Sequence, residues 1–157
     1  MKKLPVKVDE LAFPMSFNSY DSTDYLDTET GELVNIPVEL ENFDFDDELE
    51  VKRLPDWMKE ILPAAREIAE ETGRYYAVPK IPSYEIYNLM EEFAETMSDV
   101  KLRNKLLRAL NGRGAFGRFK DVLCDYPKEQ DRWFRMEEEY LEQQAREWLE
   151  ELEIEPE

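Results

Sequence analysis

Basic side chains gathered between Lys101 and Lys120 are the residues of this chain best suited to bind a ligand. The sequence of this basic window reads KLRNKLLRALNGRGAFGRFK, with seven basic residues and no acid. The seven are Lys101, Arg103, Lys105, Arg108, Arg113, Arg118 and Lys120. The whole chain has a net charge of −18, so the window carries +7 and the rest of the chain −25. A block of one sign on a chain of the other sign predicts a surface that attracts anions.

The window also contains backbone features that suit anion binding. Gly112 and Gly114 allow backbone amides to approach a ligand closely, and a helix expected to begin near Ala115 offers unpaired N–H groups. Arg113 and Arg118 have forked guanidinium groups that match a phosphate or a carboxylate. We therefore predict an anion-binding or partner-binding site formed by Lys101, Lys105, Arg108, Arg113, Gly114, Arg118 and Lys120. The window is not a P-loop, because no Gly-Lys-Ser/Thr follows its glycines.

A competing interpretation needs no ligand. Asn111 to Gly114 form a turn between two packed helices, and the basic side chains face the acidic surface of the same chain. The two interpretations differ in whether the window is exposed to solvent and free of acidic neighbours.

The residues that are missing exclude whole classes of chemistry. The chain has no histidine, which removes imidazole as a general base, a metal ligand and a member of a catalytic triad. Its one cysteine, Cys124, excludes an internal disulfide and a two-cysteine zinc or redox motif. Carboxylate chemistry or an oxygen-ligand site for a hard cation remains. Because the chain has 38 acids, no particular pair stands out, and we predict no catalytic residue, metal ligand or cofactor.

Residues 8–51 contain fourteen acids and no base. Asp44, Asp46, Asp47 and Glu48 have carboxylates for a divalent cation, although the glycine of a calcium-binding loop is absent. A solvated acidic loop is the simplest interpretation. Nucleic-acid mimicry, in which carboxylates imitate the spacing of phosphates, is a further alternative.

Length and composition indicate one globular domain over residues 1–157. Hydrophobic residues make up 42% of the chain, enough to bury a core, and no apolar run is long enough to span a membrane. The N-terminus has no secretory pattern, so we expect a cytoplasmic location. The strong acidity opposes binding to nucleic acid or an anionic membrane. The oligomeric state is left open.

Hydrophobic periodicity and turn residues predict an α+β fold. A β-hairpin is expected near residues 25–36, with its turn at Gly31, and a third strand at 74–78. The hairpin and this strand form a small antiparallel sheet packed with five to six helices, which dominate the C-terminal half. The helices are expected to begin near Asp9, Asp56, Ser83, Val100, Ala115 and Lys128, and residues 38–54 to form an acidic irregular segment.

The order of several short motifs resembles a known family. YLDTETGELVNIP is followed by Ile-Pro-Ser-Tyr, then LLRALNGRGAFGRFKDVL, and finally REWLEELEIE. Over about residues 23–154 this order is similar to that of the bacterial uncharacterised protein family 0158. The resemblance implies one shared architecture and a bacterial cytoplasmic origin. It supplies no catalytic residue.

Three functions follow from these residues. The leading hypothesis is a non-enzymatic binding or regulatory module that recognises an acidic or phosphate-bearing partner through the basic helix-turn-helix surface. The alternative is a divalent-metal-dependent enzyme acting on a small phosphorylated or nucleotide substrate, which requires a cleft where Arg113 faces at least two carboxylates. The acidic nucleic-acid mimic ranks below both.

Overall fold

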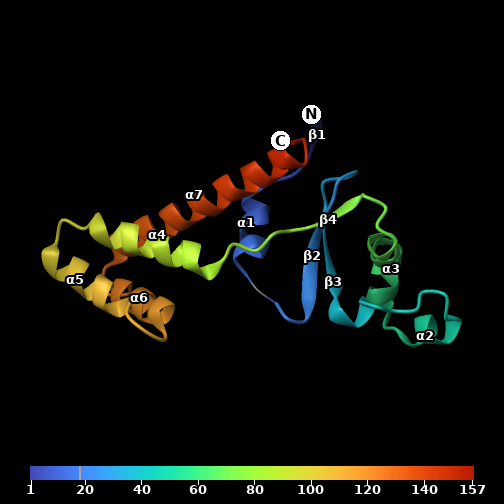
Figure 1. The fold of residues 1–157 in the computed structure, drawn as a ribbon, viewed down its shortest axis with the longest axis horizontal. Helices are drawn as coiled ribbons and strands as arrows, with labels where there is room; N and C mark the ends of the chain where they lie inside the picture. The colour runs from blue at the N-terminus through green and yellow to red at the C-terminus, as the bar shows by residue number, and fades with distance from the viewer. Residues whose placement is uncertain (18) are drawn as a thin grey trace. The chain divides into compact units, whose positions relative to one another are not determined.

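A computed structural model of the chain describes residues 1–17 and 19–157. It confirms the predicted α+β class: the described residues form seven α-helices, one 3₁₀ helix, a three-stranded antiparallel sheet and a two-stranded parallel sheet (Figure 1). They divide into two compact units. The first unit contains residues 1–80 and 144–157, and the second contains residues 81–143.

The three-stranded sheet lies in the first unit and contains the predicted hairpin. Strand β2 (Ser22–Asp27) pairs antiparallel with β3 (Leu33–Pro37), and β4 (Tyr75–Ala77) pairs with the other edge of β2. The turn between β2 and β3 requires Gly31, which has a φ of 81°. Strand β3 ends at Pro37, as expected of a residue that cannot donate to a sheet.

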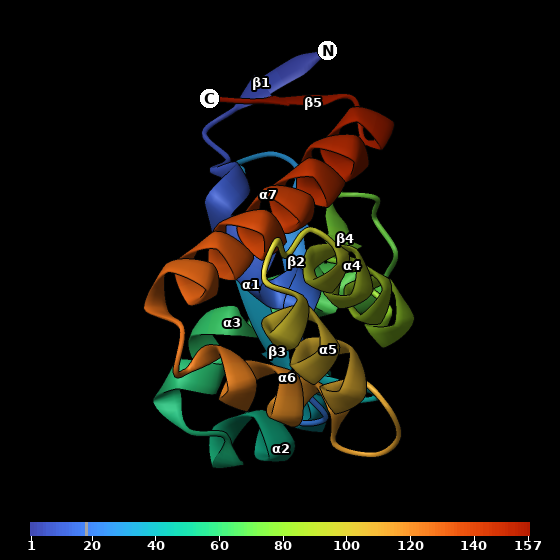
Figure 2. The same ribbon diagram turned by 90° about the vertical axis from the view of Figure 1, so that its left-hand side faces the viewer.

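The remaining strands join the two ends of the chain. Strand β1 (Lys2–Leu4) pairs in parallel with β5 (Ile154–Pro156), with Lys2 opposite Ile154 (Figure 2). Each has only three residues, too few for an alternating pattern, so the sequence gives no signal for this pair.

Helices of the first unit show where local signals are ambiguous. Helix α1 (Val8–Ser16) begins one residue before the expected Asp9, with Lys7 at its N-cap, and Pro14 lies inside its C-terminal part. A proline inside a helix usually splits or bends it, but helix α3 (Asp56–Ala69) continues through Pro63. Gly73 is a residue type that commonly ends a helix, but α3 ends earlier, at Ala69, because Glu71 already has a φ of 52°.

The segment at 38–54 is more ordered than its composition indicates. It contains the 3₁₀ helix η1 (Val38–Leu40) and helix α2 (Glu48–Arg53). The Asp47 carboxylate caps α2 by accepting hydrogen bonds from the amides of Leu49 and Glu50. Phe43 and Phe45 form no strand here and pack edge to face instead.

The second unit is helical and has its own core. It contains α4 (Ser83–Glu95), α5 (Val100–Ala109), α6 (Ala115–Leu123) and the first part of α7 (Pro127–Glu151). Phe93, Phe119 and Trp133 are fully buried and pack edge to face at its centre. Helix α4 begins at Ser83, as predicted, and has Pro82 at its N-cap. A lone cysteine next to an apolar helix residue is typically a buried thiol, but Cys124 is exposed at the end of α6.

No helix in the described residues is long and apolar enough to cross a membrane. The longest, α7, has 25 residues and carries charged side chains along its length.

Candidate functional site

Helix α5 forms because its sequence supplies both a cap and a buried face. The Asp99 carboxylate accepts hydrogen bonds from the amides of Lys101 and Leu102, at 3.0 and 3.3 Å. Leu102, Leu106 and Ala109 are buried in the core of the second unit. This packing fixes which side of the helix faces solvent.

Three of the predicted basic residues share the exposed face of α5. Lys101, Lys105 and Arg108 are separated by four and three residues, the spacing that places side chains on one helix face. All three are exposed, whereas Arg103 is half-buried on another side of the helix. Like charges at this spacing repel one another and lower the stability of the helix.

The turn between α5 and α6 is closed by Arg118. Its guanidinium donates hydrogen bonds to the backbone carbonyls of Ala109, Asn111 and Arg113, with an Nε–O distance of 3.1 Å to Ala109. Gly114, with a φ of 75°, is the N-cap of α6. Arg118 therefore holds the end of α5 and the turn together, while Arg113 leaves the turn as an exposed side chain.

The basic side chains of the window form no ion pair with the acids of the described chain. Among the described residues, no basic side chain of the window lies within 4.0 Å of a carboxylate. At longer range, burial raises the pKa of Glu137 on α7, and the positive charge of Lys120 lowers it in part. Lys101, Lys105, Arg108 and Arg113 are thus exposed and have no acidic partner within the described chain.

A groove of about 480 Å³ lies between α4 and α5, beside this basic face. Tyr87 and Glu91, four residues apart on α4, form one wall, while Asn104 and Arg108, four apart on α5, lie on the other. Leu107, Leu110 and Asn111 complete the lining. The Tyr87 hydroxyl donates a hydrogen bond of 2.9 Å to the carbonyl of Leu110, which fixes α4 to the end of α5.

The arrangement of carboxylates gives no support to a metal-dependent reaction. In residues 1–17 and 19–157, no three His, Cys, Asp or Glu side chains are placed to hold a metal ion. The groove contains a single carboxylate, Glu91, and Arg113 does not line it. Asp46, one of the candidate cation ligands, forms an ion pair with Arg66 at 2.7 Å.

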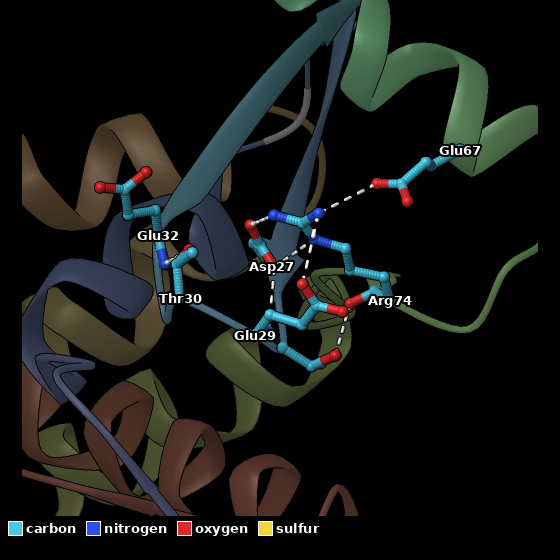
Figure 3. A network of polar contacts seen from close by, with 7 residues as sticks. Asp27, Glu29, Thr30, Glu32, Glu67 and Arg74 are labelled. Atoms are coloured by element: carbon cyan, nitrogen blue, oxygen red, sulfur yellow. Dashed lines mark hydrogen bonds and ion pairs between the residues drawn. The ribbon is translucent and has the colours of Figure 1, made fainter.

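The first unit contains a separate polar cluster, shown in Figure 3. Arg74 makes two hydrogen bonds to Asp27, from Nε and Nη2 at 2.9 and 2.8 Å, and also pairs with Glu29 and Glu67 at 3.3 Å. Asp27 is only 4% exposed, and its hydrogen bonds to Arg74 lower its pKa to about 2. The same interactions raise the pKa of Arg74. Because this cluster links β2 to the start of β4, we assign it a structural role.

Sequence reasoning missed three polar residues of the groove: Glu91, Asn104 and Asn111. The spacing of four that relates Glu91 to Tyr87 and Asn104 to Arg108 is visible in the sequence. Which faces of α4 and α5 meet is decided by packing, and no local pattern encodes it.

Fold and site together define an α+β protein whose helical unit presents a basic surface and an adjoining polar groove. The chain belongs to the family described as uncharacterised protein family UPF0158, whose model matches residues 2–157. This finding confirms the resemblance seen in the sequence.

Curated relatives come from bacteria and carry only the family name. A UPF0158 protein of Pseudomonas aeruginosa is 26% identical over 156 residues, which cover 99% of this chain and 88% of that protein. UPF0158 proteins of Chlamydia trachomatis and Chlamydia muridarum are each 32% identical over 85 residues, or 54% of this chain and 26% of theirs. The match thus spans about a quarter of the chlamydial proteins. No solved structure matches the chain.

Proposed function

We propose that this protein is a non-enzymatic binding module that recognises an acidic or phosphate-bearing partner through the exposed basic face of α5 and the turn that follows it. The binding residues are Lys101, Lys105, Arg108 and Arg113. The observation that carries the proposal is that these four cations are exposed and have no acidic partner within the described chain.

This arrangement differs from that of six basic residues outside the window, although others, such as the exposed Lys3, Lys7 and Lys52, also form no ion pair within the described chain. Arg53, Lys59, Arg66, Arg74, Lys80 and Arg132 each form an ion pair with an acid of the same chain. On a protein with 38 acids, three unpaired cations on one helix face, with Arg113 exposed in the turn that follows, form a local positive surface. An anionic partner would remove their mutual repulsion and would be attracted over a longer range.

The test compares two triple variants of equal charge. Lys101, Lys105 and Arg113 are changed together to Glu in one variant. In the control, Lys3, Lys7 and Lys52, which are exposed residues of the first unit, are changed to Glu. Arg118 is kept in both variants, because its hydrogen bonds close the turn.

Each protein is immobilised, and the material that it retains from bacterial lysate is identified by mass spectrometry and ultraviolet absorbance. Circular dichroism checks that the variants are folded. We expect the first variant to lose a partner that the wild type and the control retain. Equal retention by all three proteins would overturn the proposal.

A further inference from the structure

We propose that the groove between α4 and α5 receives a lysine or arginine side chain of the partner, with Glu91 as its counter-ion, so that the module selects an acidic polypeptide over a nucleic acid. This inference rests on the function proposed above. It names the class of partner and a residue that determines specificity.

Two opposite charges line the same groove without meeting. Neither the Glu91 carboxylate nor the Arg108 guanidinium has a hydrogen bond or an ion pair within the described chain. Because the two groups do not satisfy each other, a ligand that satisfies both must present a cation to Glu91 and an anion to Arg108. Phosphates of a nucleic acid would supply only the anion, and Glu91 would repel them.

The remaining lining suits a long cationic side chain. Leu107 and the ring of Tyr87 are half-buried apolar surfaces against which the methylene groups of a lysine would pack, leaving its ammonium at the carboxylate. Asn104 and Asn111 add side-chain amides that hydrogen-bond a peptide backbone. The volume of about 480 Å³ exceeds what one such side chain fills and leaves space for neighbouring backbone.

Glu91 is half-buried, which strengthens the attraction of its carboxylate for a bound cation. A charge that is partly removed from water interacts more strongly with a neighbouring charge than one on an open surface. The next residue on the helix, Glu92, is exposed and does not line the groove. Glu92 therefore provides a matched control of the same residue type on the same helix.

The experiment measures fluorescence anisotropy of three labelled glutamate-rich peptides of equal length. Their central residue is lysine, Nε-acetyllysine or glutamate. A labelled single-stranded oligonucleotide is a fourth probe. The proteins are the wild type, Glu91→Gln, Glu92→Gln and the Lys101/Lys105/Arg113→Glu variant.

We expect the wild type to bind the lysine peptide about tenfold more tightly than the acetyllysine peptide, the factor typical of one charge-assisted contact. Glu91→Gln should abolish this preference by weakening only the lysine peptide, and Glu92→Gln should keep it. Equal binding of both peptides by the wild type, or an equal effect of Glu91→Gln on both, would overturn the inference.

The same data separate this inference from the proposed function. If every acidic probe binds the wild type but not the triple variant, and Glu91→Gln changes no affinity, the data support the basic surface and contradict the role of Glu91. If the oligonucleotide binds and no peptide does, the basic surface again stands and the choice of a polypeptide fails. If no acidic probe depends on the basic face, the proposed function itself fails.

Discussion

Asp27 is the buried charged residue on which the sheet of the first unit depends. Its two hydrogen bonds to Arg74 satisfy a carboxylate that is only 4% exposed. Asp27 and Arg74 are 47 residues apart in the chain, so no local sequence pattern predicts this pair. The acids along the hairpin cannot be told apart from the sequence. Asp27 differs from them only because β4 pairs with β2, which brings Arg74 beside it.

Replacing Asp27 by Asn should lower the free energy of unfolding by about 2 kcal/mol at neutral pH, because it leaves Arg74 without its main counter-ion. Urea unfolding measures this change. Asp46→Asn is the control: its ion pair with Arg66 is exposed, so its loss should cost less than about 1 kcal/mol. Equal effects of the two substitutions would contradict the structural role of Asp27.

The pKa of Asp27 gives this pair a defined pH dependence. Folding lowers the pKa from 3.8 to about 2, so the folded state binds the proton less readily than the unfolded state. The stabilisation is complete above about pH 4 and is lost as the pH falls towards 2. The difference in unfolding free energy between wild type and Asp27→Asn should shrink over this interval. A constant difference down to pH 2 would show that the carboxylate has an ordinary pKa.

At the scale of the element, the turn between α5 and α6 decides whether the basic face is presented. Arg118→Gln should lower the free energy of unfolding by about 1–2 kcal/mol, because three backbone carbonyls lose their donor. Arg118→Lys should not restore it, since an ammonium lacks the planar fork. Arg113→Gln, at an exposed position in the same turn, should change the stability by less than about 0.5 kcal/mol. Thermal unfolding of the three variants provides the comparison.

The glycines of this region give a second test of the turn. Gly114→Ala should be destabilising by about 1 kcal/mol, because its φ is 75° and the new Cβ would lie 3.2 Å from Nη1 of Arg118. Gly117 lies inside α6, with nothing within 4 Å of an added Cβ, so Gly117→Ala should be stabilising by up to about 1 kcal/mol. Effects of the same sign would contradict the left-handed turn.

These elements show what the sequence predicts well and what it does not. The starts of α5 at Val100 and of α6 at Ala115 follow from local patterns and are confirmed. The sequence of helix α2 also contains two features typical of a helix, an aspartate at the N-cap and basic residues in the last turn. They are hard to recognise among the many acids of this segment. The groove could not be predicted, because it depends on how α4 packs against α5.

At the scale of the whole molecule, the charge is divided unevenly between the two units. Residues 81–143 contain 13 acids and 10 bases and carry −3, whereas the first unit carries −15. The second unit is therefore nearly neutral, so the acids of its own sequence outweigh its bases far less than the net charge of the whole chain indicates. The net charge of −18 alone does not reveal this difference in charge between the two units.

Unequal charge predicts an unequal response of the two units to salt. Excess negative charge destabilises a compact state through self-repulsion, and salt screens it, with a Debye length that falls from about 30 Å at 0.01 M to about 10 Å at 0.1 M. Hydrogen exchange of individual amides, measured at these two concentrations, should show a clear gain in protection in the first unit. The second unit should show a smaller gain, because its own core, centred on Trp133, is its main source of stability. An equal gain in both units would mean that the repulsion is shared by the whole chain, and that the basic face is not electrostatically separate from the acidic unit.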